Sequence, residues 1–389
     1  MKVQLGNMAE DLPKDREFQH PSITIYGPDA RKLAGITGNF LDVYRDINFA
    51  NALGYDGTPN QPSVILYIAF SQGVEDLSLN SPAFLGMGNV SFGNPVYDGH
   101  TIASKSKVYG NKPTRKLDRH SVGFISDAYL EPSLGEVGPF VARWTRANIV
   151  LKSNPEKEVE YNEERDGNPS KPPSITPLGT YVPQARNLAA IIERANSRGE
   201  LFADSLEPGT VFEFPYGRTM TFSTPSDTAY GFRNIATVHH DRKTVEDNPQ
   251  SYYDGYVIQF GLHTLLTASG IAGARRYATT IAELGMDNIK FSFPVMPGTT
   301  INDVRAEVVG FDDSHPASSE YATAVTYKIT AKGAIPDYLK RERDMRLLPK
   351  NGTLAGLFTG LKETDQDINN PQVLSFEYTV LQLRRPKTA

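Results

Sequence analysis

Cysteine is absent from the 389 residues of this chain. Its absence excludes disulfide bonds, catalysis by a thiolate and zinc sites built on cysteine. The sequence also shows no run of potential metal ligands, so we predict no metal site. A chain without cysteine fits a reducing compartment, and we expect a cytoplasmic location.

An excess of positive charge is also missing. The 40 Lys and Arg residues are outnumbered by 45 Asp and Glu residues, which gives a net charge of −5. This balance argues against nucleic acid or a membrane surface as a partner. The N-terminus MKVQLGNMAEDLPKDREFQH lacks the apolar stretch of a signal peptide, and the longest apolar runs are too short to span a bilayer. With 39% hydrophobic residues, the chain is predicted to be globular with a sizeable core.

The chain contains an internal repeat. Residues 85–102 read LGMGNVSFGNPVYDGHTI and residues 284–301 read LGMDNIKFSFPVMPGTTI, with ten identities in eighteen positions at a constant offset of 199. A match of this quality indicates a duplicated unit, and repeats decide the fold before any local pattern does.

The repeat extends backward to an apolar run in each copy. The runs PSVILYIAFSQG (62–73) and GYVIQFGLHTLLTASG (255–270) align through a shared Val-Ile pair at 64–65 and 257–258, and each predicts a buried helix. Upstream, residues 22–39 and 218–234 each predict a short strand and then a helix that ends near an Asn. In the second copy Thr224, Pro225 and Asp227 suit a helix start.

Strands are expected to close both copies, at 141–152 and 374–385. A long buried helix followed by antiparallel strands predicts an α+β fold in which each sheet wraps around one central helix. We therefore predict an N-terminal domain at 1–152 and a C-terminal domain at 205–389. Residues 153–204 are predicted to be a linker with a bridging helix at 187–202, and a polar excursion with the charge run KRERDMR is expected at 335–372.

These segments resemble a known family. The strand, short helix, Asn…His loop and buried helix, followed by F-x-x-P-V-x-x-G-x-T-I, are similar to the MaoC-type hotdog hydratases and dehydratases. The duplication then implies a tandem, or double, hotdog. VEDLSLNSPAFLGMGNVSFGNPVYDGHTIASKSKV (74–108), NIATVHHD and YDGYVIQ resemble the mesaconyl-CoA hydratase group, also called β-methylmalyl-CoA dehydratase.

The resemblance implies a hydro-lyase that adds water reversibly to an enoyl-CoA thioester, with mesaconyl-CoA as the expected substrate. It implies no metal and no cofactor other than the CoA of the acyl-CoA substrate, and a homodimer or higher homo-oligomer. Three alternatives stay open: an R-specific enoyl-CoA hydratase for another acyl chain, a hotdog thioesterase, and an acyl-CoA-binding protein without activity.

The wider family holds the attacking water between an Asp and a His five residues later. This chain keeps the spacing with Asn234 and His239. Asn cannot act as a base but can orient water, so His239 is predicted to carry the proton transfers. Gly255, at the expected start of the helix, is predicted to donate its backbone N–H to the thioester oxygen. The first copy has Asn39 but Tyr44 in place of the His, and is predicted to be silent.

Other residues are assigned to the substrate side of the site. His240 is expected to point away from the site, whereas Asp241 returns to the face of His239 and can fix its tautomer or the loop. Tyr256 and Val257 follow Gly255 and are expected to contact the substrate. Candidate cations for a substrate carboxylate are Arg233, Arg31 and Arg45, and those for the CoA phosphates are Arg275 and Arg276, although a surface pair is the simpler interpretation.

Overall fold

A computed structural model describes residues 5–156, 158–174, 181, 183–221, 229–247, 256–337 and 370–385. Three predictions therefore fall outside the described residues. These are the helix start at Thr224, Pro225 and Asp227, the donor assigned to Gly255, and most of the excursion predicted at 335–372.

The first half holds the following elements in chain order: η1 (Ala9–Asp11), β1 (Glu17–Gln19), β2 (Ile23–Thr24), α1 (Gly27–Ile36), η2 (Asp42–Tyr44), α2 (Ile47–Ala52), α3 (Pro62–Gln72), α4 (Val74–Leu77), β3 (Ala83–Phe92), β4 (Thr101–Pro113), β5 (Arg119–Leu130) and β6 (Phe140–Leu151). The connection to the second half carries α5 (Glu163–Asp166) and α6 (Leu188–Ser197), the latter within the range predicted for a bridging helix.

The second half continues with η3 (Ala203–Ser205), β7 (Val211–Phe214), β8 (Arg218–Thr219), η4 (Thr237–His239), α8 (Arg242–Asp247), α9 (Gly261–Ala272), β9 (Thr280–Phe291), β10 (Thr300–Asp312), β11 (Ala322–Ala334) and β12 (Gln372–Leu383).

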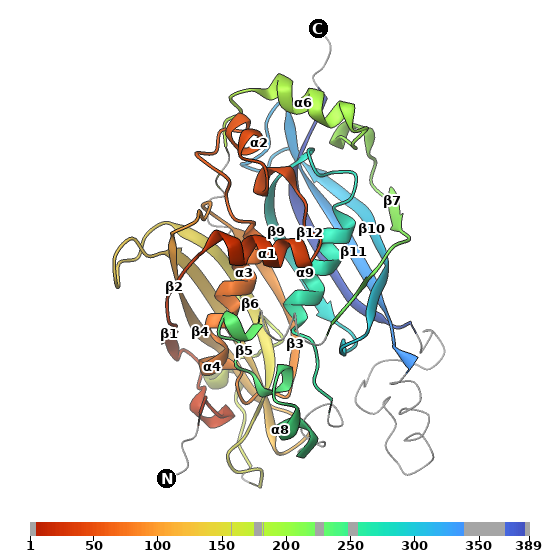
Figure 1. The fold of residues 1–389 in the computed structure, drawn as a ribbon. Coiled ribbons are helices and arrows are strands. Elements are labelled where there is room, and N and C mark those ends of the chain that lie inside the picture. The colour runs from red at the N-terminus through yellow and green to blue at the C-terminus, as the bar shows by residue number, and fades with distance from the viewer. Residues whose placement is uncertain are drawn as a thin grey trace.

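One antiparallel sheet of twelve strands runs through both halves. Its order is β1-β4-β5-β6-β3-β9-β12-β11-β10-β7, with β2 and β8 paired at the outer strands β4 and β10. The halves join where β3 pairs with β9, with Val90 opposite Met286 and Ser91 opposite Gly285. Each half-sheet curves around its own central helix, α3 or α9 (Figure 1). The predicted α+β fold, one wrapped sheet per copy, is confirmed.

The two central helices pack against each other in the middle of the molecule. Both carry almost no charge, and nearly every residue of α3 and α9 is buried, as expected for a helix that is apolar all round. The Phe260 ring, just before α9, lies 4.8 Å from Tyr67 and 5.6 Å from Phe70 of α3, measured between centroids. The start of α9 is therefore held against the helix of the other half.

The structure corrects the backward alignment of the repeat. Pro62 of α3 corresponds to Gly261 of α9 at the offset of 199 that also relates β3 to β9 and β4 to β10. The earlier elements η2 and α2 correspond to η4 and α8 at an offset of 195. The offset between the two copies therefore increases by four residues, from 195 to 199, between Asp247 and Gly261. The predicted alignment of Val64-Ile65 with Val257-Ile258 was wrong. The apolar residues before Gly261 have the spacing of a helix, but residues 256–260 are not helical.

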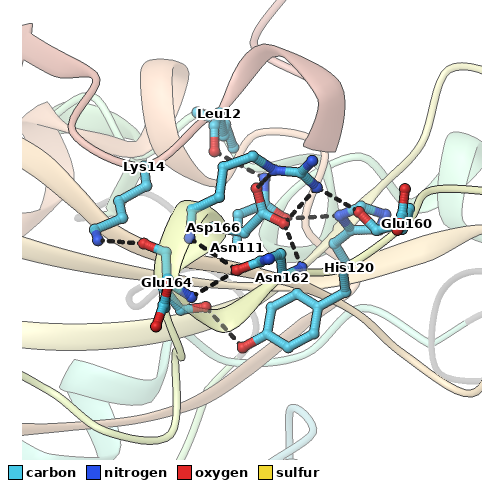
Figure 2. Close-up of polar contacts among 11 residues, drawn as sticks. Leu12, Lys14, Asn111, His120, Glu160, Asn162, Glu164 and Asp166 are labelled. Atoms are coloured by element: carbon cyan, nitrogen blue, oxygen red, sulfur yellow. Dashed lines mark hydrogen bonds and ion pairs between the residues drawn. The ribbon is translucent and has the colours of Figure 1, made fainter.

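The connection between the halves is polar, as predicted, but it is folded against the first half. The Asn162 side chain caps α5 by accepting from the N–H groups of Glu164 and Arg165. Figure 2 shows how this segment meets β4 and the N-terminal residues: Lys14 donates to the Glu164 carbonyl at 3.0 Å, while Asn111 donates to the Leu12 carbonyl at 2.7 Å. Its composition is that of a linker, whereas its contacts are those of a docked segment.

Candidate active site

A cavity of about 390 Å³ opens between the two halves. The second half contributes the loop residues with the predicted Asn and His, the start of α9 and the segment after β9. The first half contributes the end of α3, the start of β3 and the turn between β4 and β5. Among the lining residues are Asn234, His239, Gln259, Gly261, Phe291, Phe70, Phe84, Lys116, Arg119 and Asn148.

His239 ends the short helix η4 and faces this cavity. Its Nδ1 lies 3.0 Å from the Ile258 carbonyl oxygen. A carbonyl only accepts, so Nδ1 carries the proton and Nε2 is the basic nitrogen of the neutral ring. Loss of hydration in the half-buried site lowers the pKa of His239 to about 4, with a smaller contribution in the same direction from His240 and an opposing one from the Ile258 carbonyl. The ring is therefore neutral at pH 7 and can accept a proton.

Asn234 is fully buried at the wall of the same cavity. Its Oδ1 accepts from the Ala236 N–H at 3.2 Å, which fixes which atom is oxygen. Its Nδ2 has no hydrogen-bond partner among the described residues. An unpartnered buried amide is costly unless a water or a ligand completes it. Within the described residues, Asn234 therefore keeps an unused donor at the wall of the cavity.

Helix α9 begins at Gly261, six residues after the predicted donor Gly255. Residues 256–260 are extended or irregular, so the expectation that YDGYVIQ opens the helix was wrong. The first N–H groups of a helix have no partner within the helix. In the described part of the chain, the N–H groups of Gly261 and Leu262 make no hydrogen bond, and Gly261 lines the cavity. They form a positive helix end suited to a developing oxyanion.

The first half has a counterpart of this site that is closed. The corresponding cavity measures only about 30 Å³ and is lined by Tyr44, Pro62 and Glu283, among others. Tyr44 ends η2 where His239 ends η4. Pro62 stands in place of Gly261 and has no N–H to donate.

The Glu283 carboxylate from β9 occupies the start of α3. It accepts from the Ser63 N–H at 2.7 Å, from Gln61 Nε2 at 2.6 Å and from the Tyr378 hydroxyl at 2.5 Å. Burial raises the pKa of Glu283, and these donors oppose that shift. At the offset of 199, the counterpart of Glu283 is Phe84, which lines the open cavity, and no carboxylate of the described residues lines it at the start of α9.

Asn39 differs from Asn234 in the same way. Its Nδ2 donates to the Leu266 carbonyl at 2.8 Å and to Thr37 Oγ1 at 3.0 Å, and its Oδ1 accepts from Gln61 at 3.0 Å. The NH₂ group of Asn39 is thus used within the fold, whereas that of Asn234 has no partner among the described residues.

Two of the neighbouring polar residues have structural contacts. Asp241 lies directly before α8, and its carboxylate accepts from the Thr244 N–H at 3.0 Å and from the Thr244 hydroxyl at 2.7 Å. It does not line the cavity, and the tautomer of His239 is set by Ile258 instead. The prediction of Asp241 as a substrate contact is therefore not supported. His240 is exposed and packs edge-on against Tyr230, although the segment is a 3-10 turn rather than a strand.

The remaining predicted substrate contacts do not line the cavity. In the segment before α9 the lining starts at Ile258, directly after Tyr256 and Val257. Arg233 has a φ of 72° and pairs with Glu75 at 3.4 Å. The other candidate arginines also have partners in the fold: Arg31 with Asp98, Arg45 with the Phe40 ring, Arg275 with the Gly199 carbonyl, and Arg276 with the Ala272 carbonyl and the Tyr327 ring. Arg276 is buried, so the two do not form a surface pair.

Several lining residues were not anticipated. Gln259 is buried, and its Oε1 has no partner among the described residues. Lys116 and Arg119 come from the turn between β4 and β5 of the first half. The sequence signal for them was the cluster NKPTRKLDR, but only the β3–β9 junction shows that it reaches the second half's site.

Among the described residues, no group of three or more His, Asp or Glu side chains is placed to hold a metal ion. Within the same ranges, no helix is long and apolar enough to cross a membrane.

Solved structures with this fold define the class. A MaoC domain protein dehydratase from Chloroflexus aurantiacus matches with a TM-score of 0.75 at 21% identity, covering 99% of both chains. A Mycobacterium tuberculosis protein described as a double hotdog matches with a TM-score of 0.68 at 17% identity, covering 97% of this chain and 98% of that one. The fold is thus a MaoC-like double hotdog, as predicted.

Sequence comparison then specifies the family. The model of the mesaconyl-CoA hydratase family matches residues 3–334, and the chain belongs to this family of hydro-lyases. The β-methylmalyl-CoA dehydratase of Chloroflexus aurantiacus is 26% identical over 70% of this chain and 75% of its own length. The mesaconyl-CoA hydratase of Haloarcula marismortui is 24% identical over 84% and 86%, respectively.

Proposed function

We propose that this protein catalyses the reversible hydration of mesaconyl-CoA to β-methylmalyl-CoA at one site per chain. The observation that carries the proposal is one open cavity lined by a neutral His239, by Asn234 and by the start of α9. Among the described residues, neither Asn234 Nδ2 nor the first N–H groups of α9 have a hydrogen-bond partner. The names of the relatives supply the acyl group.

The chemistry follows from these three parts. The substrate carbonyl oxygen accepts from the N–H groups at the start of α9, and Asn234 orients the water by donating from Nδ2. His239 Nε2 takes one proton from the water as its oxygen bonds to Cβ, and the electron pair of the double bond moves onto the thioester as an enolate. His239 then returns that proton to Cα. One water is added, and the ring ends in its starting state.

The low pKa of His239 suits both steps. Above about pH 4 the ring is a neutral base, and once protonated it is a strong enough acid to release its proton to the enolate carbon. The wider MaoC-type family has an Asp where this chain has Asn234. With Asn there, His239 alone carries the proton in both directions. This proposal requires no metal and no cofactor besides the substrate's own CoA.

The open site weighs against a protein that only binds acyl-CoA. In the silent half the helix start is covered by Glu283 and the asparagine is fully bonded, whereas among the described residues of the second half no carboxylate covers the start of α9 and Asn234 Nδ2 has no partner. A thioesterase is disfavoured because no acid lines the described part of the cavity at the start of α9. The cysteine-free composition supports a cytoplasmic location.

A spectrophotometric assay tests the function. Purified protein should lower the ultraviolet absorbance of mesaconyl-CoA without releasing free thiol, and crotonyl-CoA in parallel reports how far a smaller uncharged acyl group is accepted. The variant His239→Ala should lose at least about 100-fold in kcat, the usual contribution of a positioned acid–base group. The matched variant His240→Ala should stay near wild type. Thiol release would identify a thioesterase, and full activity in His239→Ala would refute the site.

A further inference from the structure

The turn between β4 and β5 in the first half carries a concentration of positive charge. Residues 112–119, called here the basic hairpin, contain Lys112, Arg115, Lys116 and Arg119 against one acid, Asp118. Its charge is +3, from four cations and one acid, in a chain whose net charge is −5. Lys112 lies over the Tyr161 ring of the docked connection, and the proton chemistry above gives Arg115, Lys116 and Arg119 no role.

The counterpart turn in the second half has the opposite charge. Residues 312–320, between β10 and β11, read DDSHPASSE and contain three acids with no Lys or Arg. The two turns descend from the same repeat, so the difference is not imposed by the topology. Of these two turns, the positively charged one reaches the open cavity.

Two cations of the basic hairpin line the cavity that contains His239 and Gly261. Lys116 is exposed and has no ion-pair partner among the described residues. Arg119 is held in place by Asp118, which accepts from Nε at 2.7 Å and from Nη2 at 2.5 Å. That pairing also lowers the pKa of Asp118, whose charge offsets only one of the two cations.

The acids of the docked connection do not cancel this charge at the cavity. Glu163 pairs with Lys171 at 2.8 Å, and Asp166 pairs with Arg165 at 2.8 Å. None of the described residues between 158 and 174 lines the cavity. Lys116 and Arg119 therefore keep a net positive charge at the wall of the cavity that also contains the catalytic groups.

We propose that the basic hairpin binds the phosphates of CoA while the thioester lies at the start of α9. This inference rests on the proposed function and adds a role for the half without a catalytic histidine. The pyrophosphate and ribose phosphate of CoA are multiply charged anions, for which Arg supplies a fixed fork and Lys a mobile point charge. An exposed site suits these groups, because phosphates stay hydrated while the acyl chain is buried.

A carboxylate at the far end of the acyl chain is the competing ligand for the same cations. The exposed position of Lys116 favours the phosphates, because a carboxylate inside an apolar cavity needs a buried partner. Lys328 offers a matched control, since it is an exposed lysine on β11 that does not line the cavity.

Calorimetry on the full chain tests the inference with CoA and with pantetheine, which lacks the phosphates. We expect Lys116→Ala to weaken CoA binding about 3- to 5-fold and Lys116→Glu about 10-fold or more, the range for a partly screened ion pair. Lys328→Glu should leave CoA binding unchanged, and no variant should alter pantetheine binding. Added salt should weaken CoA binding to the wild type more than to Lys116→Ala.

Three outcomes would overturn the assignment. The first is unchanged CoA affinity in Lys116→Glu, and the second is an equal loss for pantetheine. The third is that Lys116→Glu loses turnover on the pantetheine thioester of mesaconate but keeps it on the pantetheine thioester of crotonate. That result would show that the basic hairpin binds the acyl carboxylate. CoA binding needs no turnover, so a wild type that hydrates no enoyl-CoA would refute the proposed function and leave this test intact.

Discussion

Asn39 and Asn234 occupy the same place in the two halves, and their amides are used differently. Asn39 makes three side-chain hydrogen bonds inside the fold, including one across the molecule to Leu266. Among the described residues Asn234 makes one, which shapes its own loop, and its Nδ2 has no partner. A single residue type therefore serves stability in one half and is available for chemistry in the other.

The two alanine variants should separate these roles. Asn39→Ala is expected to lower the free energy of unfolding by about 1–3 kcal/mol, because buried partners lose their hydrogen bonds, with little effect on kcat. Asn234→Ala should lower kcat by at least about 10-fold with a smaller loss of stability. Urea denaturation and the hydration assay, run on both proteins, provide the comparison. Equal losses of kcat would contradict a silent first half.

The pKa of His239 predicts the acid limb of the activity profile. The base form is present above its folded pKa of about 4, so kcat/KM should stay level from pH 7 to about 5 and fall with an apparent pKa near 4. An acid limb near 6.5, the ordinary value for histidine, would contradict the buried neutral ring.

The lowered pKa of His239 also makes the stability of the fold depend on pH. The dependence is opposite to that of a histidine whose charged form is stabilised by folding. The folded pKa lies below the unfolded one, so the unfolded chain binds more protons between about pH 6.5 and 4. Stability is therefore lost as the pH falls through this window. Unfolding midpoints measured at each pH will separate this loss from protonation of the catalytic base.

At the scale of the element, the first turns of α3 and α9 differ in what covers them. Helix α3 starts with a proline and is capped by Glu283, whereas α9 starts with a glycine next to the Phe291 ring. A Cβ on Gly261 would lie 3.0 Å from Cε1 of that ring. The glycine keeps both an N–H and the room in front of it.

A pair of variants isolates the N–H group. Gly261→Pro removes the donor at a position where proline fits a helix, and should lower kcat by about 100-fold or more, as expected for a lost oxyanion donor. Gly261→Ala keeps the donor and adds a similar crowding against Phe291, so its loss of kcat should be much smaller. Circular dichroism checks that both variants fold. Equal losses would attribute the effect to crowding rather than to the amide.

The sequence was sufficient for the repeat, and it placed Asn234 and His239 close enough together that both line one cavity, because a spacing within one loop survives in the fold. Their catalytic roles stay a prediction. It misplaced the start of α9 by six residues, because the apolar residues before Gly261 carry the helical pattern on into an irregular segment. It missed Lys116, Arg119 and Phe84 because their place in the site depends on the pairing of β3 with β9, which no local pattern encodes.

At the scale of the whole molecule, one open and one closed cavity predict the binding stoichiometry. Titration with CoA or with a slowly reacting acyl-CoA should give one site per chain, because Glu283 and Pro62 block the counterpart. Calorimetry or equilibrium dialysis measures this number on the wild type. Two sites per chain would show that the closed half opens in solution. The number of sites is counted per chain, so it does not depend on whether the chain forms the predicted homo-oligomer.

The position shared by Phe84 and Glu283 lies on the strand that joins its half to the other, and it lines the cavity of that other half. In an assembly of two identical single-hotdog chains, one gene would have to encode the same residue at both places. Fusion of the halves removes that constraint. Mutations at residue 84 can then be selected for substrate specificity, and mutations at residue 283 for the stability of the contact between the halves. The substrate range of this chain can therefore evolve without loss of stability at the junction.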